Sequence, residues 1–532
     1  MASVREATYQ LLRSLQLTTI FGNPGSTEET FLQDFPDDFT YVLGLQESSV
    51  VAMADGYAQM MERPALVNLH TAPGVGNSLG NLSTAWHNKS PLIITAGQQT
   101  REMLLMEPFL TNLEATELPK PYVKWSYETA RAEDAPAAIM RAYSEALQPP
   151  SRPVFVSIPV DDWDKDALGV AVVRQVSRRM APDPERIAEV ADALSKSKNP
   201  LLVTGADIDR TNSWDLAISL AELLRCPVWA APASERVGFP ENHPQYQGVL
   251  PFAVKPLGEK LKDHDLVLVI GAPVFRYYPN IPGDILPAGT RLIQVTDDPH
   301  YTAAAPVGES ILGDVGLALQ ALTKLVTPSK RATPSAVPAP PAPEAKTPIS
   351  PAFLFNAIAE TRSEDSVIVE ESLSNLATLH KYIRVTKPKS FLTMASGGLG
   401  FGLPAAIGVA LAERETGRNR KVIAIIGDGS FQYSIQALWT AVQHNLPVLF
   451  IVPRNSEYAT LKSFANQEKT RGVPGLDLPG LQTAVLAQGY GCEAVRVTKP
   501  EELKAALEKN MANLVPTVLE VLITADVPPL LK

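Results

Sequence analysis

Residues 422–458 constrain this chain more than any other stretch, because they read as one complete strand–helix–strand unit. The run at 422–426 is too short for a helix and rich in β-branched residues, which is typical of a buried strand. A glycine-rich break at 427–430 follows, and then apolar residues recur at helical spacing from Phe431 to Val442. A second apolar run at 448–452 predicts a parallel strand, reached by a right-handed crossover.

Two polar side chains follow these strands at the same end. Asp428 lies just beyond the first strand and Asn455 just beyond the second, so both belong to the rim where open α/β sheets bind ligands. The glycines beside Asp428 let backbone amides approach a ligand, and the next helix N-terminus suits a phosphate. One carboxylate and one amide oxygen make a good partial shell for Mg²⁺ if diphosphate oxygens complete it. An ordinary βα turn with an exposed aspartate is the competing interpretation.

Residues 1–180 also alternate strands with helices, which predicts a parallel, doubly wound sheet. Ser26, Glu47 and His70 each follow a predicted strand, so we expect them on one rim. Ser26 has an alternative as a loop hydroxyl or helix cap, and His70 as a structural histidine. Glu47 precedes an alanine- and valine-rich helix, so we expect it to be partly buried and to need a partner or a raised pKa.

The middle part of the chain, residues 183–326, contains further predicted parallel strands at 200–205, 227–230, 266–271 and 291–295. No Gly-x-Gly-x-x-Gly follows any of them, so we expect no dinucleotide site. Packing and assembly are the main expected role of this part. Its segment 275–278 leaves the predicted rim and is placed to reach a neighbouring site.

These segments predict an α/β protein of three doubly wound parallel-sheet domains, at residues 1–180, 183–326 and 352–532. Residues 328–351 contain eight prolines and should form an extended linker before the last domain. The first and last domains share a layout of proline-led strands, which suggests two similar domains with the middle one inserted between them.

Composition narrows the class of function. The net charge of −10 argues against a nucleic-acid partner, and two cysteines provide neither a disulfide framework nor a zinc pattern. No apolar run approaches membrane-spanning length, and the first residues lack the features of a secretion signal. We therefore expect a cytoplasmic protein with no membrane partner.

Several motifs together resemble the benzoylformate decarboxylases, a family of thiamine-diphosphate-dependent 2-oxo acid decarboxylases. They lie at residues 22–26, 45–47, 70, 395–400 and 427–430, with Asn455 completing the metal–diphosphate signature. The resemblance extends over nearly the whole chain. It implies the pyruvate-decarboxylase-like fold, in which a pyrimidine-binding, a middle and a diphosphate-binding domain follow one another. It also implies a homotetramer built from dimers, with each active site at a subunit interface.

The resemblance further implies roles for single residues. Glu47 would pair with the pyrimidine ring of thiamine diphosphate, while Ser26 and His70 would face a small 2-oxo acid substrate. Gly397 would offer its carbonyl to the pyrimidine amino group, and Leu399 would hold the cofactor bent. The implied Mg²⁺ ligands are Asp428, Asn455 and the backbone carbonyl of Glu457, and Ca²⁺ can take the place of Mg²⁺. The implied diphosphate contacts are Ser374, Gly429, Ser430 and Tyr458. The implied lining of the aromatic pocket is Leu110, Tyr278, Thr460 and Phe464.

The implied reaction is the non-oxidative decarboxylation of an aromatic 2-oxo acid, benzoylformate, to benzaldehyde and CO₂, with the cofactor as electron sink. Glu47, His70 and Ser26 form the implied catalytic set. Glu47 would share a proton with the pyrimidine nitrogen, His70 would transfer protons near neutral pH, and Ser26 would bind the substrate carboxylate.

The chain departs from the family pattern at four positions, each of which bears on function. Tyr278 replaces a second active-site histidine, Arg454 replaces an asparagine, and Thr460 and Leu373 stand where substrate preference is set. Two rival hypotheses remain open. One is a carboligase of the acetolactate-synthase kind, and the other is a cofactor-binding relative without catalytic activity.

Overall fold

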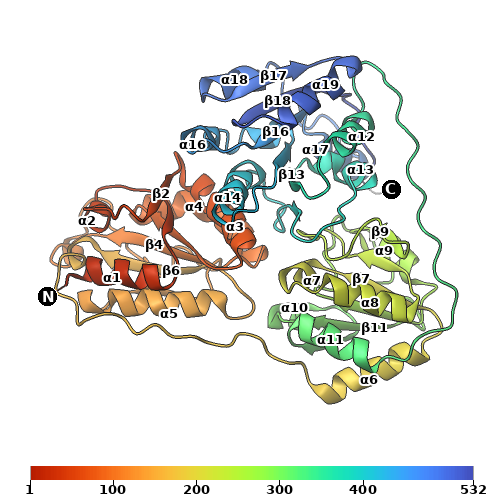
Figure 1. Ribbon diagram of the computed structural model, residues 1–532, viewed down its shortest axis with the longest axis horizontal. Coiled ribbons are helices and arrows are strands. Elements are labelled where there is room, and N and C mark those ends of the chain that lie inside the picture. The colour runs from red at the N-terminus through yellow and green to blue at the C-terminus, as the bar shows by residue number, and fades with distance from the viewer. Residues whose placement is uncertain (1, 531–532) are drawn as a thin grey trace.

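The computed structural model describes residues 2–530 and contains three parallel six-stranded sheets (Figure 1). Each sheet is built from one continuous part of the chain, residues 19–159, 200–312 and 367–522. The first domain lies at the left of Figure 1, the middle domain below and to the right, and the last domain at the top. The prediction of three doubly wound α/β domains is confirmed.

The first sheet has helices on both faces. Its elements are α1 (Val4–Ser14), β1 (Thr19–Asn23), α2 (Glu29–Leu32), β2 (Thr40–Leu43), α3 (Glu47–Met61), β3 (Ala65–Leu69), α4 (Thr71–His87), β4 (Leu92–Gln98), η1 (Leu104–Met106), β5 (Ser126–Glu128), η2 (Ala132–Asp134), α5 (Ala135–Leu147), β6 (Val154–Pro159) and η3 (Val160–Asp162). The strand order is β2-β1-β3-β4-β6-β5. Strands β3, β4 and β6 are buried along their whole length, which explains their continuous apolar sequences. The edge strand β5 is half-buried and polar, and the sequence did not predict it.

The middle sheet has the strand order β9-β8-β7-β10-β11-β12, which is the order of dinucleotide-binding sheets. Its elements are α6 (Pro184–Lys196), β7 (Pro200–Thr204), α7 (Ala206–Arg210), α8 (Trp214–Leu224), β8 (Val228–Ala230), β9 (Tyr246–Val249), α9 (Val254–Leu261), β10 (Leu266–Ile270), β11 (Arg291–Thr296), α10 (Pro299–Ala304), β12 (Glu309–Leu312) and α11 (Val315–Leu325). The predicted strands correspond to β7, β8, β10 and β11. The sequence missed β9 and β12, because these edge strands are only partly buried and carry no apolar run.

The last sheet has the order β14-β13-β15-β16-β18-β17. Its elements are α12 (Pro351–Thr361), β13 (Val367–Glu371), η4 (Leu373–Asn375), α13 (Leu376–Tyr382), β14 (Phe391–Leu392), α14 (Gly402–Glu415), β15 (Val422–Ile426), α15 (Asp428–Phe431), α16 (Ala437–Gln443), β16 (Leu449–Arg454), α17 (Ala459–Glu468), α18 (Thr483–Gly489), β17 (Glu493–Val497), α19 (Pro500–Met511) and β18 (Thr517–Leu522). The strand–helix–strand unit is present, with β15 and β16 parallel.

The single helix predicted from Phe431 to Val442 is wrong, because α15 ends at Phe431 and α16 begins only at Ala437. Turns occupy the residues between them. In these turns the Ser434 hydroxyl donates to the Gly400 carbonyl at 2.7 Å, and this tertiary contact competes with the local preference for a continuous helix.

The first and last sheets have the same topology, since numbering the strands within each domain produces the order 2-1-3-4-6-5 in both. The helices after the second strands, α3 and α14, pack against each other where the two domains meet (Figure 1). A Cβ on Gly408 would lie 1.8 Å from the Met53 carbonyl oxygen, and one on Gly56 would lie 2.3 Å from that of Ala405. The close approach of these helices therefore requires glycine at both positions.

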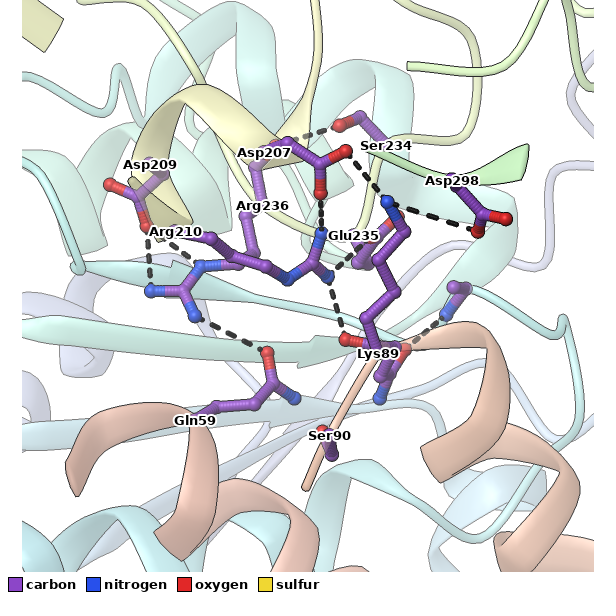
Figure 2. A network of polar contacts seen from close by, with 12 residues as sticks. Gln59, Lys89, Ser90, Asp207, Asp209, Arg210, Ser234, Glu235, Arg236 and Asp298 are labelled. Carbon is purple, nitrogen blue, oxygen red and sulfur yellow. Dashed lines mark hydrogen bonds and ion pairs between the residues drawn. The ribbon is translucent and has the colours of Figure 1, made fainter. Parts of the chain in front are cut away.

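A buried ion-pair network joins the first domain to the rim of the middle sheet (Figure 2). Lys89, after α4, contacts Asp207 at 2.7 Å and Asp297 at 2.8 Å, and Arg210 bridges Asp207 and Glu235. Burial disfavours the Lys89 ammonium, but the surrounding carboxylates outweigh burial and raise its pKa. The space left at this rim is about 10 Å³, room for roughly one water molecule. Side chains thus fill the place where sheets of this order bind a dinucleotide.

The predicted linker runs along the outer edge of the molecule from the middle domain to the last domain (Figure 1). It contains no helix or regular strand between Thr327 and Ser350, and α12 begins at Pro351, the last residue of the predicted linker. Among residues 2–530, no helix has the length and apolar character needed to cross a membrane.

Candidate active site

One rim of the first sheet collects the three predicted catalytic residues. Strands β2, β1 and β3 are neighbours and parallel, so the segments that follow them lie side by side. Ser26 is exposed in the loop after β1, Glu47 begins α3 after β2, and His70 follows β3 and directly precedes α4. The prediction that these residues share a rim is confirmed.

Glu47 is a buried carboxylate with an exposed fraction of 8%. Its two oxygens accept hydrogen bonds from the side-chain amides of Asn23 and Asn77, each at 3.1 Å. No lysine, arginine or histidine in the described part of the chain forms an ion pair with it. The sequence analysis missed both asparagines, although Asn23 belongs to the Gly-Asn-Pro-Gly-Ser motif. These two amide donors orient the carboxylate but do not neutralise it, so it can still interact with a proton donor or a cationic group of a ligand.

His70 is oriented by a buried carboxylate that the sequence analysis also missed. Its Nδ1 lies 2.9 Å from Glu28 Oε2 and 3.1 Å from Thr27 Oγ1. Glu28 is 1% exposed and also accepts the backbone N–H groups of Gly25 and Gly97 at 2.9 and 2.7 Å. A carboxylate at Nδ1 directs the ring so that Nε2 is the nitrogen available for proton transfer. The position of Glu28 within the 22–28 loop was the only sequence signal.

The rim of the last sheet carries the predicted metal ligands. Asp428 is buried, and its oxygens accept the N–H groups of Gly429 at 3.0 Å and Ser456 at 2.7 Å. Burial raises the pKa of Asp428 above its ordinary value. Asn455 directly follows the neighbouring strand β16, and its Oδ1 accepts the Glu457 N–H at 3.2 Å. A bound cation would offset the cost of keeping the Asp428 carboxylate ionised there.

The surroundings of Asp428 fit a diphosphate-bound metal better than a bare one. Residues 2–530 contain no group of three or more histidine, cysteine or acidic side chains that could hold a metal ion. A metal at Asp428 would therefore take other oxygens as well, such as those of a diphosphate. Gly429 lies against the Tyr458 ring, where a Cβ would come within 2.5 Å of a ring carbon. Glu457 pairs with Lys462 through one oxygen, while its buried Oε1 has no partner. Ser430 is buried beside Gly429, and Ser374 lies in η4 at the end of the adjacent strand β13.

The loop with Gly397 and Leu399 connects β14 to α14. Gly397 is exposed with a φ of +76°, while Leu399 is half-buried against the core shared by the first and last domains. Three contacts fasten this loop to α4 and its C-terminal cap: Ser396 Oγ to Thr84 Oγ1 at 2.8 Å, Asn81 Nδ2 to the Gly400 carbonyl at 3.1 Å, and the Ala395 N–H to Asn88 Oδ1 at 2.9 Å.

Two of the predicted pocket residues meet across a domain boundary. Tyr278 reaches from the middle domain to α17, where its ring centroid lies 4.6 Å from that of Phe464. Tyr278 is nevertheless 63% exposed. Thr460 lies on the same helix as Phe464, one turn earlier. Leu110 belongs to the first domain, in an exposed apolar segment that also contains Leu105, Met106, Phe109 and Leu113.

Comparison with known proteins identifies the family of the chain. The thiamine pyrophosphate enzyme family matches in three parts: its N-terminal TPP-binding domain at residues 2–118, its central domain at 187–322 and its C-terminal TPP-binding domain at 374–521. The chain is 48% identical over 525 residues to benzoylformate decarboxylase of Pseudomonas aeruginosa, covering 98% of this chain and 99% of that protein.

Two solved structures are similar over nearly the whole chain. A benzoylformate decarboxylase from Polynucleobacter necessarius superposes with a TM-score of 0.98 and 50% identity, covering 99% of this chain and 100% of the other. A 4-hydroxybenzoylformate decarboxylase from Rhodococcus jostii has a TM-score of 0.95 and 42% identity, with 99% and 100% covered. The chain therefore belongs to the thiamine-diphosphate-dependent enzyme family that includes the benzoylformate decarboxylases.

Proposed function

We propose that this protein is a carboxy-lyase that uses thiamine diphosphate and Mg²⁺ to convert benzoylformate to benzaldehyde and CO₂. The observation that carries the proposal is that two domains of the same topology each collect polar residues at one rim of the sheet. One holds Glu47 and the Glu28–His70 pair, and the other holds Asp428 and Asn455. The names of the similar proteins, which act on benzoylformate and 4-hydroxybenzoylformate, support an aromatic 2-oxo acid as the substrate.

The last domain would hold the cofactor by its diphosphate. Asp428, Asn455 and the backbone carbonyl of Glu457 would bind Mg²⁺, or Ca²⁺ in its place, and Ser374, Gly429, Ser430 and Tyr458 would contact the diphosphate. The burial of the Asp428 carboxylate, which accepts the backbone N–H groups of Gly429 and Ser456, supports a cation at this rim. When bound, thiamine diphosphate supplies the electron sink for the bond to CO₂.

The first domain would supply proton transfer. Glu47 would exchange a proton with the pyrimidine ring. From the last domain, the Gly397 carbonyl would accept from the pyrimidine amino group, and Leu399 would hold the cofactor bent. His70 would move a proton at its Nε2, with Nδ1 held by Glu28. Ser26 would donate a hydrogen bond to the substrate carboxylate. Leu110, Tyr278, Thr460 and Phe464 would surround the aryl ring and exclude water, which favours loss of the charged carboxylate.

We further propose that the protein works as a homotetramer with each active site between subunits. The side chains of Leu105 and Phe109 are 96% and 95% exposed, and Leu113 is exposed near them. An apolar segment of this kind on a globular chain marks a binding surface. A second copy of the chain would cover it and would bring Leu110 toward the pocket of another subunit.

The deciding experiment supplies the metal-loaded enzyme with benzoylformate, pyruvate or branched 2-oxo acids and identifies the products. We expect benzaldehyde and CO₂ from benzoylformate, with activity lost on chelation and restored by Mg²⁺ with thiamine diphosphate. A hydroxyketone formed from a 2-oxo acid alone would favour a carboligase. Tight cofactor binding without turnover of any substrate would favour a non-catalytic relative. Sedimentation at working concentration tests the tetramer.

A further inference from the structure

We propose that Glu371 is a positioning residue that holds the loop of Gly397 and Leu399 in the shape that the cofactor requires. The inference rests on the proposed function, because it concerns the proposed cofactor site. Glu371 ends β13 and belongs to no motif that the sequence analysis assigned. Its side chain and its backbone contact two different loops of that site.

The side chain of Glu371 fastens the end of the 395–400 loop. Its Oε1 accepts the Gly400 N–H at 2.7 Å, and its Oε2 accepts the N–H of Gly402, the first residue of α14. The residue that precedes α14, Phe401, has no side-chain cap of its own. Glu371 therefore caps this helix from a neighbouring strand, where a carboxylate also interacts favourably with the helix dipole.

The backbone of Glu371 contacts the segment 427–430, which contains the proposed metal ligand Asp428. Its carbonyl oxygen accepts the N–H of Gly427 at 3.0 Å, and Gly427 directly precedes Asp428. The next residues along the chain lead to Ser374 in η4. One residue thus connects the loop expected to contact the pyrimidine, the loop expected to bind the metal and the segment expected to contact the diphosphate. Moving Glu371 would displace these loops relative to one another.

The charge on Glu371 is costly to the fold, which points to a role beyond packing. The residue is fully buried, and no cation in the described chain forms an ion pair with it. Glu370 on the same strand is also buried and adds like-charge repulsion. Burial raises the pKa of Glu371 to about 7, against the opposing effect of the N–H groups of Gly400 and Gly402. A neutral side chain would avoid this cost, but it could not accept both N–H groups.

The test compares Glu371→Gln and Glu371→Asp with a matched control, Glu413→Gln, at the other end of α14. Glu413 is also a buried carboxylate, but it pairs with Arg418 and Arg420. Two quantities are measured besides turnover: amide hydrogen exchange of residues 396–403 in the cofactor-free protein, and affinity for thiamine diphosphate with Mg²⁺ by fluorescence titration. The first readout is independent of activity.

We expect Glu371→Gln to exchange the Gly400 and Gly402 amides about 10-fold faster and to bind thiamine diphosphate about 10- to 100-fold more weakly. Glu371→Asp keeps the charge but is shorter, so its loss of affinity should lie between those of Glu371→Gln and the parent. Glu413→Gln should leave both quantities unchanged, whatever its effect on thermal stability.

Other outcomes separate this inference from the proposed function. A parent protein that does not bind thiamine diphosphate would overturn the proposed function and this inference together. A parent that binds it, with Glu371→Gln equal to the parent in exchange and affinity, would overturn the inference alone. If Glu413→Gln loses as much amide protection and cofactor affinity as Glu371→Gln, Glu371 contributes only to general stability and the inference is overturned. The same conclusion follows if both Glu371 variants fail to fold while Glu413→Gln folds.

Discussion

The first and last domains have the same strand order, yet their equivalent strands end in different chemistry. Strand β3 leads to His70 at the start of α4, and its counterpart β15 leads to Asp428 at the start of α15. The second strands lead to α3, which begins with Glu47, and to α14, which begins with Gly402.

This difference matches the two proposed tasks of the rims, anion binding and proton transfer, which need different kinds of groups. Anion binding is served by backbone N–H groups at glycine-rich strand ends, which need close approach and little side-chain bulk. Proton transfer needs titratable side chains held by partners, such as the Glu28–His70 pair. The middle sheet provides a third case, since its rim is filled by the ion pairs of Lys89 and Arg210 (Figure 2).

The largest expected effect is a loss of turnover when Glu47, on the rim of the first sheet, is changed. Glu47→Gln keeps the shape but cannot exchange a proton as the carboxylate does, so turnover of benzoylformate should fall about 10²- to 10⁴-fold. Cofactor affinity should change little, because the residues proposed to hold the diphosphate belong to the other domain. Steady-state rates and a thiamine diphosphate titration measure the two quantities. Glu62→Gln, just beyond the end of α3, is the control, and near-parental turnover in Glu47→Gln would refute its role.

The second effect should be a loss of cofactor affinity, when Asp428 on the rim of the last sheet is changed. Asp428→Asn removes the charge that a diphosphate-bound Mg²⁺ needs, so affinity for thiamine diphosphate should fall by roughly 10²-fold while the fold is kept. Asp477→Asn is a matched control, because Asp477 is an exposed carboxylate that pairs with Lys462 near the same loop. If folded Asp428→Asn retains the cofactor as the parent does, the division of tasks between the two rims is wrong.

A smaller effect should come from the middle domain. Near neutral pH a phenol is a weaker proton shuttle than an imidazole, so Tyr278→His should raise benzoylformate turnover, by roughly 10-fold or less. Tyr278→Phe should keep the contact with Phe464 and lose only the hydroxyl. Turnover numbers for both variants and the parent decide the matter. Equal rates in all three would mean that Tyr278 takes no part in the chemistry.

The smallest expected effect is on stability and concerns Glu371. The pKa of Glu371 in the folded chain is about 7, which is above the ordinary carboxyl value, so at a pH between these two values Glu371 is protonated in the folded chain and ionised in the unfolded chain. Lowering the pH from about 8 to 6 should therefore stabilise the folded parent. The Tm difference between the parent and Glu371→Gln should shift in favour of the parent by about 1–3 °C as the pH is lowered over this range. A Tm difference that is flat with pH would show that Glu371 does not titrate there.

Sequence reasoning found the strand ends but not the partners of the residues on them. Glu47, His70, Asp428 and Asn455 were predicted to lie on rims, and the parallel ladders place them there. Glu28 was missed because its role depends on His70 and Gly97, which are distant in the chain. The edge strands β5, β9 and β12 were missed because partial burial removes the apolar pattern that marks a strand.

The sequence by itself determined the architecture, since short β-branched runs between amphipathic segments are compatible only with buried parallel strands covered by helices. It also determined which residues stand at strand ends, because that depends on order along the chain alone. Only the tertiary structure decided that Glu371 caps α14, that Tyr278 meets Phe464, and that ion pairs fill the middle rim. These contacts join segments far apart in the chain, and their geometry depends on how whole domains pack.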